Sequence, residues 1–97
     1  MSFKVRVSDS LRRRMIAWSL PDPILVDVYL RLQELRDEPA QKLMRLREPF
    51  DGMHYIFSMI DPQDRLTEYR FLFLVRYGQD EESLIVVRGG LRKATGY

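Results

Sequence analysis

Apolar and polar side chains alternate along residues 69–77, in the last third of the chain. A period of two predicts a β-strand whose successive side chains point to opposite faces of a sheet. One face is aromatic and apolar, and the other combines arginine with leucine: Tyr69, Phe71, Phe73, Val75 and Tyr77 against Arg70, Leu72, Leu74 and Arg76. We expect the aromatic face to pack on a helical layer and the arginine-bearing face to remain open.

Three further segments have strand character. Residues 2–7 alternate apolar with basic side chains, residues 53–60 form a second strand, and residues 84–88 form the strand that follows 69–77. The turn sequences Asp61-Pro62-Gln63-Asp64 and Gly78-Gln79-Asp80 separate the last three strands, which predicts antiparallel hairpins. Beyond residue 88, we expect Gly89 and Gly90 to bend a basic tail across the sheet.

Helical periodicity lies between the first two strands. Leu11, Met15 and Trp18 are spaced for one face of a short helix that begins after a serine N-cap. Pro21 and Pro23 end this helix and start the next, whose apolar residues recur at intervals of three and four: Leu25, Val28, Leu32 and Leu35. We also expect a further helical turn within residues 41–47, with Leu43 and Leu46 pointing inward.

This order of elements predicts one α+β domain over residues 1–97. The last three strands should form an antiparallel meander. The first strand should join the sheet parallel to a distant member of that set, because two helices intervene. Both helices would then cover a single face. A chain of 97 residues buries only roughly 60 to 65% of its unfolded surface, so one small core is expected.

Charge is distributed unevenly, although the net charge is only +2. Five basic residues and a single acid fall within the first fifteen positions, and residues 83–97 contain three basic residues and no acid. Acids gather in the middle of the chain. Basic ends around an acidic centre suit binding of a polyanion on one side of the molecule. Solvated charges on helix and turn surfaces are the simpler alternative.

The composition also excludes several classes of site. The chain has no cysteine, which removes disulfides and thiolate metal ligands. No apolar run approaches the roughly 18 residues that a membrane span requires, so we expect a cytoplasmic protein that does not contact membranes. We find no paired carboxylates, metal-ligand cluster or nucleophile triad, and therefore expect neither a metal nor another cofactor.

Pairing between the second and third strands should extend the open face. His54, Ile56, Ser58 and Ile60 would then lie beside Arg70, Leu72 and Leu74. A patch built from Ile56, Ile60, Leu72 and Leu74 is too apolar to remain bare in a monomer. We expect a partner protein, a second copy of the chain in a homodimer, or the chain's own tail to cover it.

The element order, the motif Tyr69-Arg70-Phe71-Leu72-Phe73 and a tail in which Arg92-Lys93 precedes Tyr97 by three intervening residues together resemble the RelE/ParE superfamily of bacterial toxins. The resemblance covers nearly the whole chain in element order and mainly residues 69–97 in sequence. It implies a RelE-like fold, a toxin of a type II toxin–antitoxin system, and a cognate antitoxin as partner.

Members that cleave messenger RNA on the ribosome imply a site for this chain. Arg70 would take the place of the strand arginine, Arg92 (or Arg88) that of the tail arginine, and Tyr97 that of the tyrosine. His54 would assist, since His54 and Ile56 occupy the positions of two lysines in the family. Arginine stabilises charge on a pentacoordinate phosphate, and a phenolate can take the proton of the attacking 2′-hydroxyl without a metal. The side chains expected to bind RNA around this site are Ser58, Arg76, Arg88 and Lys93.

Each of these residues also has a structural interpretation. Arg70 can form a salt bridge with the nearby Glu68, His54 can be a histidine without catalytic function, and Tyr97 can be inert at the end of the chain. Two other functions share the same fold. The protein could inhibit DNA gyrase, as ParE toxins do, or bind only its antitoxin.

Overall fold

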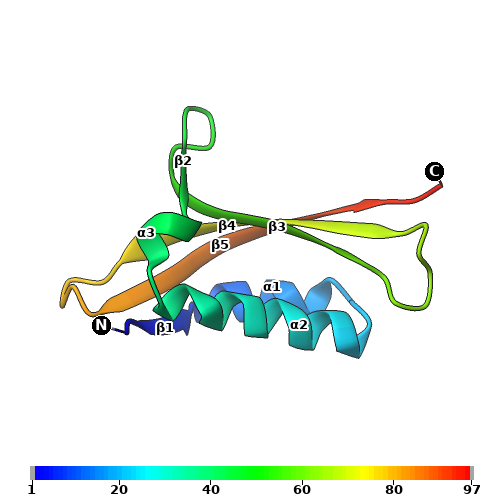
Figure 1. Cartoon of the computed structure of the whole chain (residues 1–97), viewed down its shortest axis with the longest axis horizontal. Coiled ribbons are helices and arrows are strands. Elements are labelled where there is room, and N and C mark those ends of the chain that lie inside the picture. Colours follow the sequence, from blue (N-terminus) through cyan, green and yellow to red (C-terminus); the bar gives the residue numbers. More distant parts are fainter. Residues whose placement is uncertain (1, 97) are drawn as a thin grey trace.

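One mixed five-stranded sheet organises the computed structural model, which describes residues 2–96 (Figure 1). The strands are β1 (Lys4–Val7), β2 (Met44–Leu46), β3 (Gly52–Ile60), β4 (Glu68–Tyr77) and β5 (Ser83–Ala94), arranged in the order β1-β5-β4-β3-β2. β3, β4 and β5 form the predicted antiparallel meander, and β1 joins β5 in parallel. The α+β fold class and the parallel first strand are thus confirmed.

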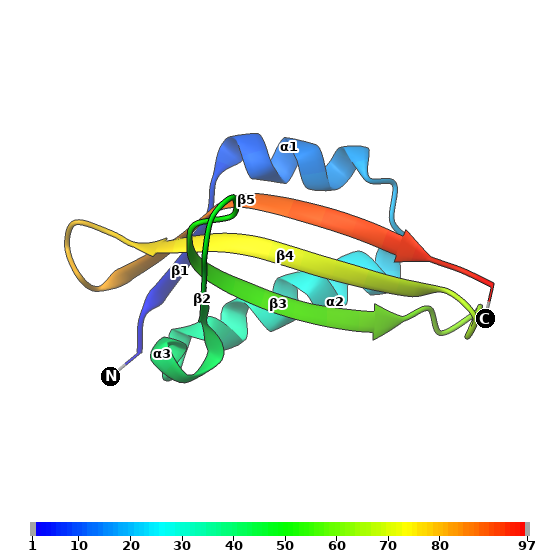
Figure 2. The ribbon, with the colours of Figure 1, turned by 90° about the horizontal axis from the view of Figure 1, so that it is seen from above.

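The helices are α1 (Asp9–Ala17), α2 (Asp22–Gln33), the 3₁₀ turn η1 (Glu34–Arg36) and α3 (Pro39–Lys42). α1 and α2 lie on one side of the sheet, with α1 along β5 and α2 beneath β3 (Figure 2). Ser8 caps α1, because its hydroxyl oxygen accepts a hydrogen bond from the Leu11 amide at 3.2 Å. Among residues 2–96, no helix is long and apolar enough to cross a membrane.

The core lies between these helices and the aromatic face of the sheet. Tyr55 pairs with Phe73 and Phe57 pairs with Phe71 across β3 and β4, so the predicted face assignment is confirmed. The Phe57 and Phe71 rings stack with centroids 5.2 Å apart. The helical side chains that complete this core are fully buried: Met15, Ile24, Val28, Leu32 and Leu35.

The helical turn expected within residues 41–47 is present as α3, but it begins earlier, at Pro39. α3 ends at Lys42, and the next residues form β2, an edge strand that pairs with the start of β3. Gly52, with a φ of 113°, allows the tight return between β2 and β3 that a larger residue would resist. This hairpin, residues 44–53, rises from the sheet on the side opposite the helices (Figure 1).

The basic tail also differs from expectation. Gly89 and Gly90 do not bend the chain, and β5 continues as a strand to Ala94. A β-bulge also lies near the β4 residues Leu74 and Val75, where β5 holds one extra residue, Val87. Residues two positions apart in a regular strand share a face. Here Val86 faces the core and Arg88 faces the open side, so the extra residue reverses the alternation of β5.

Candidate functional site

Three cross-strand rows form the centre of the open face. Along β3, β4 and β5 they are Ser58–Arg70–Arg92, Ile56–Leu72–Gly90 and His54–Leu74–Arg88. Adjacent rows lie about 7 Å apart, since each strand advances two residues between them. The apolar middle row therefore separates two rows that carry arginine.

Arg70 and Arg92 lie directly opposite each other on β4 and β5. Two like charges in this position repel each other. One of them is partly neutralised, because Arg70 Nε donates to Glu68 Oε1 at 2.8 Å. Arg92 forms no ion pair within residues 2–96. An anion that approached this row would thus meet one unpaired and one partly compensated guanidinium.

His54 lies in a different row from Arg70 and Arg92. Its side chain is only 4% exposed, and its Nδ1 is 3.0 Å from the Gly52 carbonyl oxygen, to which it can donate. Four residues of strand, or about 13 Å, separate its row from that of Arg70. The hairpin 44–53 lies beside it, because Met44 pairs with His54 at the edge of the sheet.

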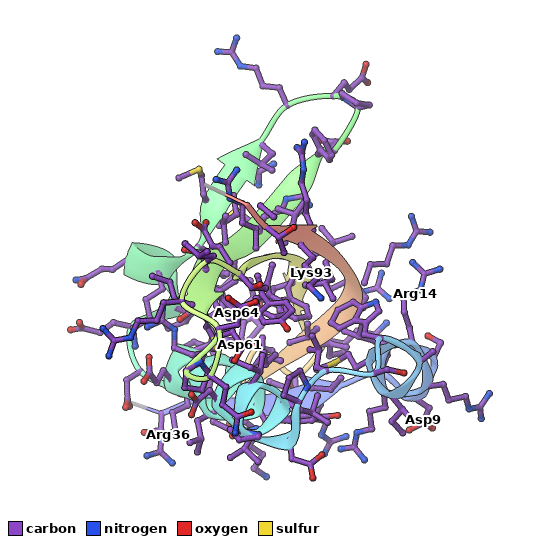
Figure 3. All side chains as sticks on the ribbon, turned by 90° about the vertical axis from the view of Figure 1, so that its right-hand side faces the viewer. Asp9, Arg14, Arg36, Asp61, Asp64 and Lys93 are labelled. Carbon is purple, nitrogen blue, oxygen red and sulfur yellow. The ribbon has the colours of Figure 1, made fainter. Side chains whose placement is uncertain are left out.

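Two of the expected RNA-binding residues lie away from the central rows. Lys93 faces the helical side, where its Nζ is 5.9 Å from the centroid of the Tyr69 ring. Tyr69 in turn donates to Asp61 Oδ2 at 3.2 Å. Figure 3 labels Lys93 together with Asp61 and Asp64. Burial, with this hydrogen bond, raises the pKa of the Tyr69 phenol above 10.0. Arg76 pairs with Ile85 near the opposite end of the sheet.

Tyr97 is outside the described residues, so its catalytic role stays a prediction. Ser58 and Arg88 both belong to the central rows, Ser58 beside Arg70 and Arg88 beside Leu74. Among residues 2–96, no group of three or more His, Asp or Glu side chains is arranged to hold a metal ion.

A groove runs along the open face between the sheet and the projecting hairpin. Its volume is about 480 Å³, and Leu46 and Phe50 of the hairpin contribute to its lining together with Ile56, Arg70, Leu72, Gly90 and Arg92. Ile56 is 46% exposed within it, while Leu72 and Leu74 are half-buried. The tail does not cover this apolar floor because residues 89–94 remain in the sheet.

A second hollow adjoins the groove on the other side of Phe50. It has a volume of about 260 Å³, and Arg14, Pro49, His54, Leu74 and Arg88 are among its lining residues. Sequence reasoning missed Arg14, Leu46 and Phe50. An isolated phenylalanine between Pro49 and Gly52 was the available signal, since this proline and glycine mark a turn and a turn leaves an apolar side chain at the surface.

Comparisons with known proteins add a structural similarity. No family model matches the chain, and no curated protein does so. Among solved structures, the chain is similar to the crystal structure of the toxin–antitoxin complex RelBE2 from Mycobacterium tuberculosis, with a TM-score of 0.61 and 27% sequence identity. The match covers 95% of this chain and 93% of the other.

Proposed function

This chain belongs to the RelE/ParE superfamily, and from that premise we propose that it is the toxin of a type II toxin–antitoxin system, with a cognate antitoxin as its partner. The proposal is supported by a structural match over nearly the whole chain to a protein of such a complex. An exposed apolar groove adds support, because a partner that covers Ile56 would remove apolar area from water.

We further propose that the open face cleaves messenger RNA on the ribosome. The observation that carries this proposal is the pairing of Arg70 and Arg92 across adjacent strands of that face. In the reaction, a 2′-hydroxyl oxygen attacks the neighbouring phosphorus, and the bond from phosphorus to the 5′-oxygen breaks. The 5′-oxygen takes a proton from water, which yields a 2′,3′-cyclic phosphate and a 5′-hydroxyl end. The two guanidiniums stabilise the added negative charge of the pentacoordinate phosphate, and Tyr97 takes the proton of the attacking hydroxyl.

A toxin that binds without cleaving is the second candidate. His54 is buried and lies two rows away from Arg70, and the Arg70 guanidinium is already paired with Glu68. Both observations suit a surface that inhibits DNA gyrase or engages only an antitoxin.

Expression of the chain in bacteria tests the nuclease proposal. We expect growth arrest with cleavage of ribosome-bound messages. Arg70→Ala and Tyr97→Ala should relieve the arrest, because loss of a transition-state donor or a general base lowers the rate by about two to four orders of magnitude. Arg36→Ala is the matched control, since this exposed arginine lies in η1, outside the open face (Figure 3).

Several outcomes would contradict the nuclease proposal. A harmless wild-type chain, or intact messages during arrest, would exclude cleavage. Arrest that persists in both variants, accompanied by inhibited DNA supercoiling, would identify gyrase as the target. Thermal melts of each variant test whether the substitutions leave the fold intact.

A further inference from the structure

Phe50 occupies an unusual position on the open face. Its side chain is 58% exposed at the tip of the hairpin 44–53, and it lines both the groove and the adjoining hollow. Beneath it lies the row formed by Leu72 and Gly90, which the two spaces also share. An isolated exposed apolar residue needs no explanation. An exposed aromatic ring between two arginine-lined spaces can stack on a flat group of a ligand whose negative charges the arginines bind.

Arginines lie on both sides of Phe50. Arg14 of α1 and Arg88 line the hollow, and Arg70 and Arg92 line the groove. Within residues 2–96, the side chains of Arg14, Arg88 and Arg92 form no ion pair and no hydrogen bond. Arg88 and Arg92 are four strand residues apart, or about 13 Å. The surface thus offers positive charge, an exposed ring, and positive charge again.

We propose that this surface is a binding site for single-stranded RNA in which a nucleobase stacks on Phe50. The phosphate on one side of that nucleotide lies at Arg14 and Arg88, and a phosphate on the other side lies at Arg92. The inference rests on the proposed function and specifies how its substrate is held. Repeating phosphates with flat bases between them match this alternation, and base–aromatic stacking tolerates any sequence.

Gly90 keeps the site open. A Cβ atom added at this position would have no heavy atom within 4 Å, so its place lies in empty space on the floor below Phe50. A large side chain at position 90 would therefore fill the groove without disturbing the core. Gly90→Leu is expected to exclude the base while leaving the fold unchanged.

Fluorescence anisotropy of the full chain tests the site. The probe is a labelled 2′-O-methyl oligoribonucleotide, which binds as a single strand but lacks the attacking hydroxyl. Phe50→Leu keeps the apolar character and loses the aromatic face, so its affinity should fall about tenfold or more, whereas Phe50→Trp should bind at least as tightly as the wild type. Tyr77→Leu, at another exposed aromatic residue outside the site, is the matched control and should change nothing.

Inorganic polyphosphate separates stacking from charge. Its binding should weaken in Arg88→Ala and remain unchanged in Phe50→Leu. Equal oligonucleotide affinity of Phe50→Leu and wild type would overturn the stacking site, while the proposed nuclease would stand if Arg70→Ala still abolished cleavage. A wild-type chain that binds no oligonucleotide would overturn both. Loss of antitoxin binding in Phe50→Leu with unchanged RNA binding would assign the ring to a protein partner and overturn the RNA site.

Discussion

At the scale of single residues, two adjacent glycines have opposite environments. A Cβ atom at Gly89 would lie 2.6 Å from the Phe73 ring and 3.0 Å from Leu11 Cδ1, whereas one at Gly90 would meet nothing. Gly89 therefore allows the core ring to lie against the β5 backbone, and Gly90 leaves space on the open face. Neither glycine is needed for a turn.

We predict that Gly89→Ala destabilises the fold by about 1 to 3 kcal/mol, because the added methyl group overpacks a fully buried ring. Gly90→Ala, its neighbour on the same strand, should leave the stability unchanged or raise it slightly, since alanine reduces the entropy of the unfolded chain. Urea unfolding of both variants measures the difference. Equal midpoints for the two would contradict the packing that we describe around Phe73.

At the scale of elements, the turn between β4 and β5 depends on one carboxylate. Asp80 accepts hydrogen bonds from the Glu82 and Ser83 amides and from the Ser83 hydroxyl. These hydrogen bonds, led by that of the Glu82 amide, lower the pKa of Asp80 below 3.8. The folded-state pKa is thus lower than the unfolded one. The ionised carboxylate consequently stabilises the fold above the unfolded pKa, and this contribution is lost as pH falls through the folded pKa.

We predict that Asp80→Asn lowers Tm at pH 7. The difference from wild type should narrow as pH falls from the unfolded pKa of about 4 through the lower folded pKa, because the wild-type carboxylate then also becomes neutral. Thermal melts between pH 3 and pH 7 measure this. Asp51→Asn is the control, because Asp51 forms no side-chain hydrogen bond or ion pair within residues 2–96. A constant difference across the pH range would show that the charge of Asp80 is not responsible.

At the scale of the whole molecule, the two faces of the sheet have different roles. Helices α1 and α2 lie against one face, and the hairpin 44–53 rises above the strands on the other (Figure 1). Beside that hairpin, Ile56 and Phe50 remain exposed near several arginines. The antitoxin that we propose would therefore cover apolar floor and positive charge together, which favours a segment that carries both apolar and acidic side chains.

We predict that Ile56→Asp weakens the complex with the antitoxin at least tenfold, because it places a charge on the apolar floor that the partner would bury. Titration calorimetry measures the affinity, and light scattering of the isolated chain reports whether a second copy covers the patch instead. Ile16→Asp is the control, since Ile16 is an exposed isoleucine of α1, outside the groove. Equal losses in the two variants would argue against the groove as the docking surface.

The sequence by itself determined which side chains share a face, because period-two and helical patterns are local properties of the chain. The faces of β3 and β4, the aromatic core, the parallel position of β1 and the superfamily could all be predicted from these patterns and from the motif at residues 69–73. The placement of both helices on one face followed from the order of the elements.

Only the tertiary structure decided how the open face is built. The bulge at Val87 reverses the alternation of β5, and it thereby places Arg92 opposite Arg70 and turns Lys93 toward the helices. The hairpin 44–53 lies beside the buried His54 and presents Phe50 above the groove. Both features depend on pairing between strands that are distant in sequence, and a local pattern carries no information on such pairing.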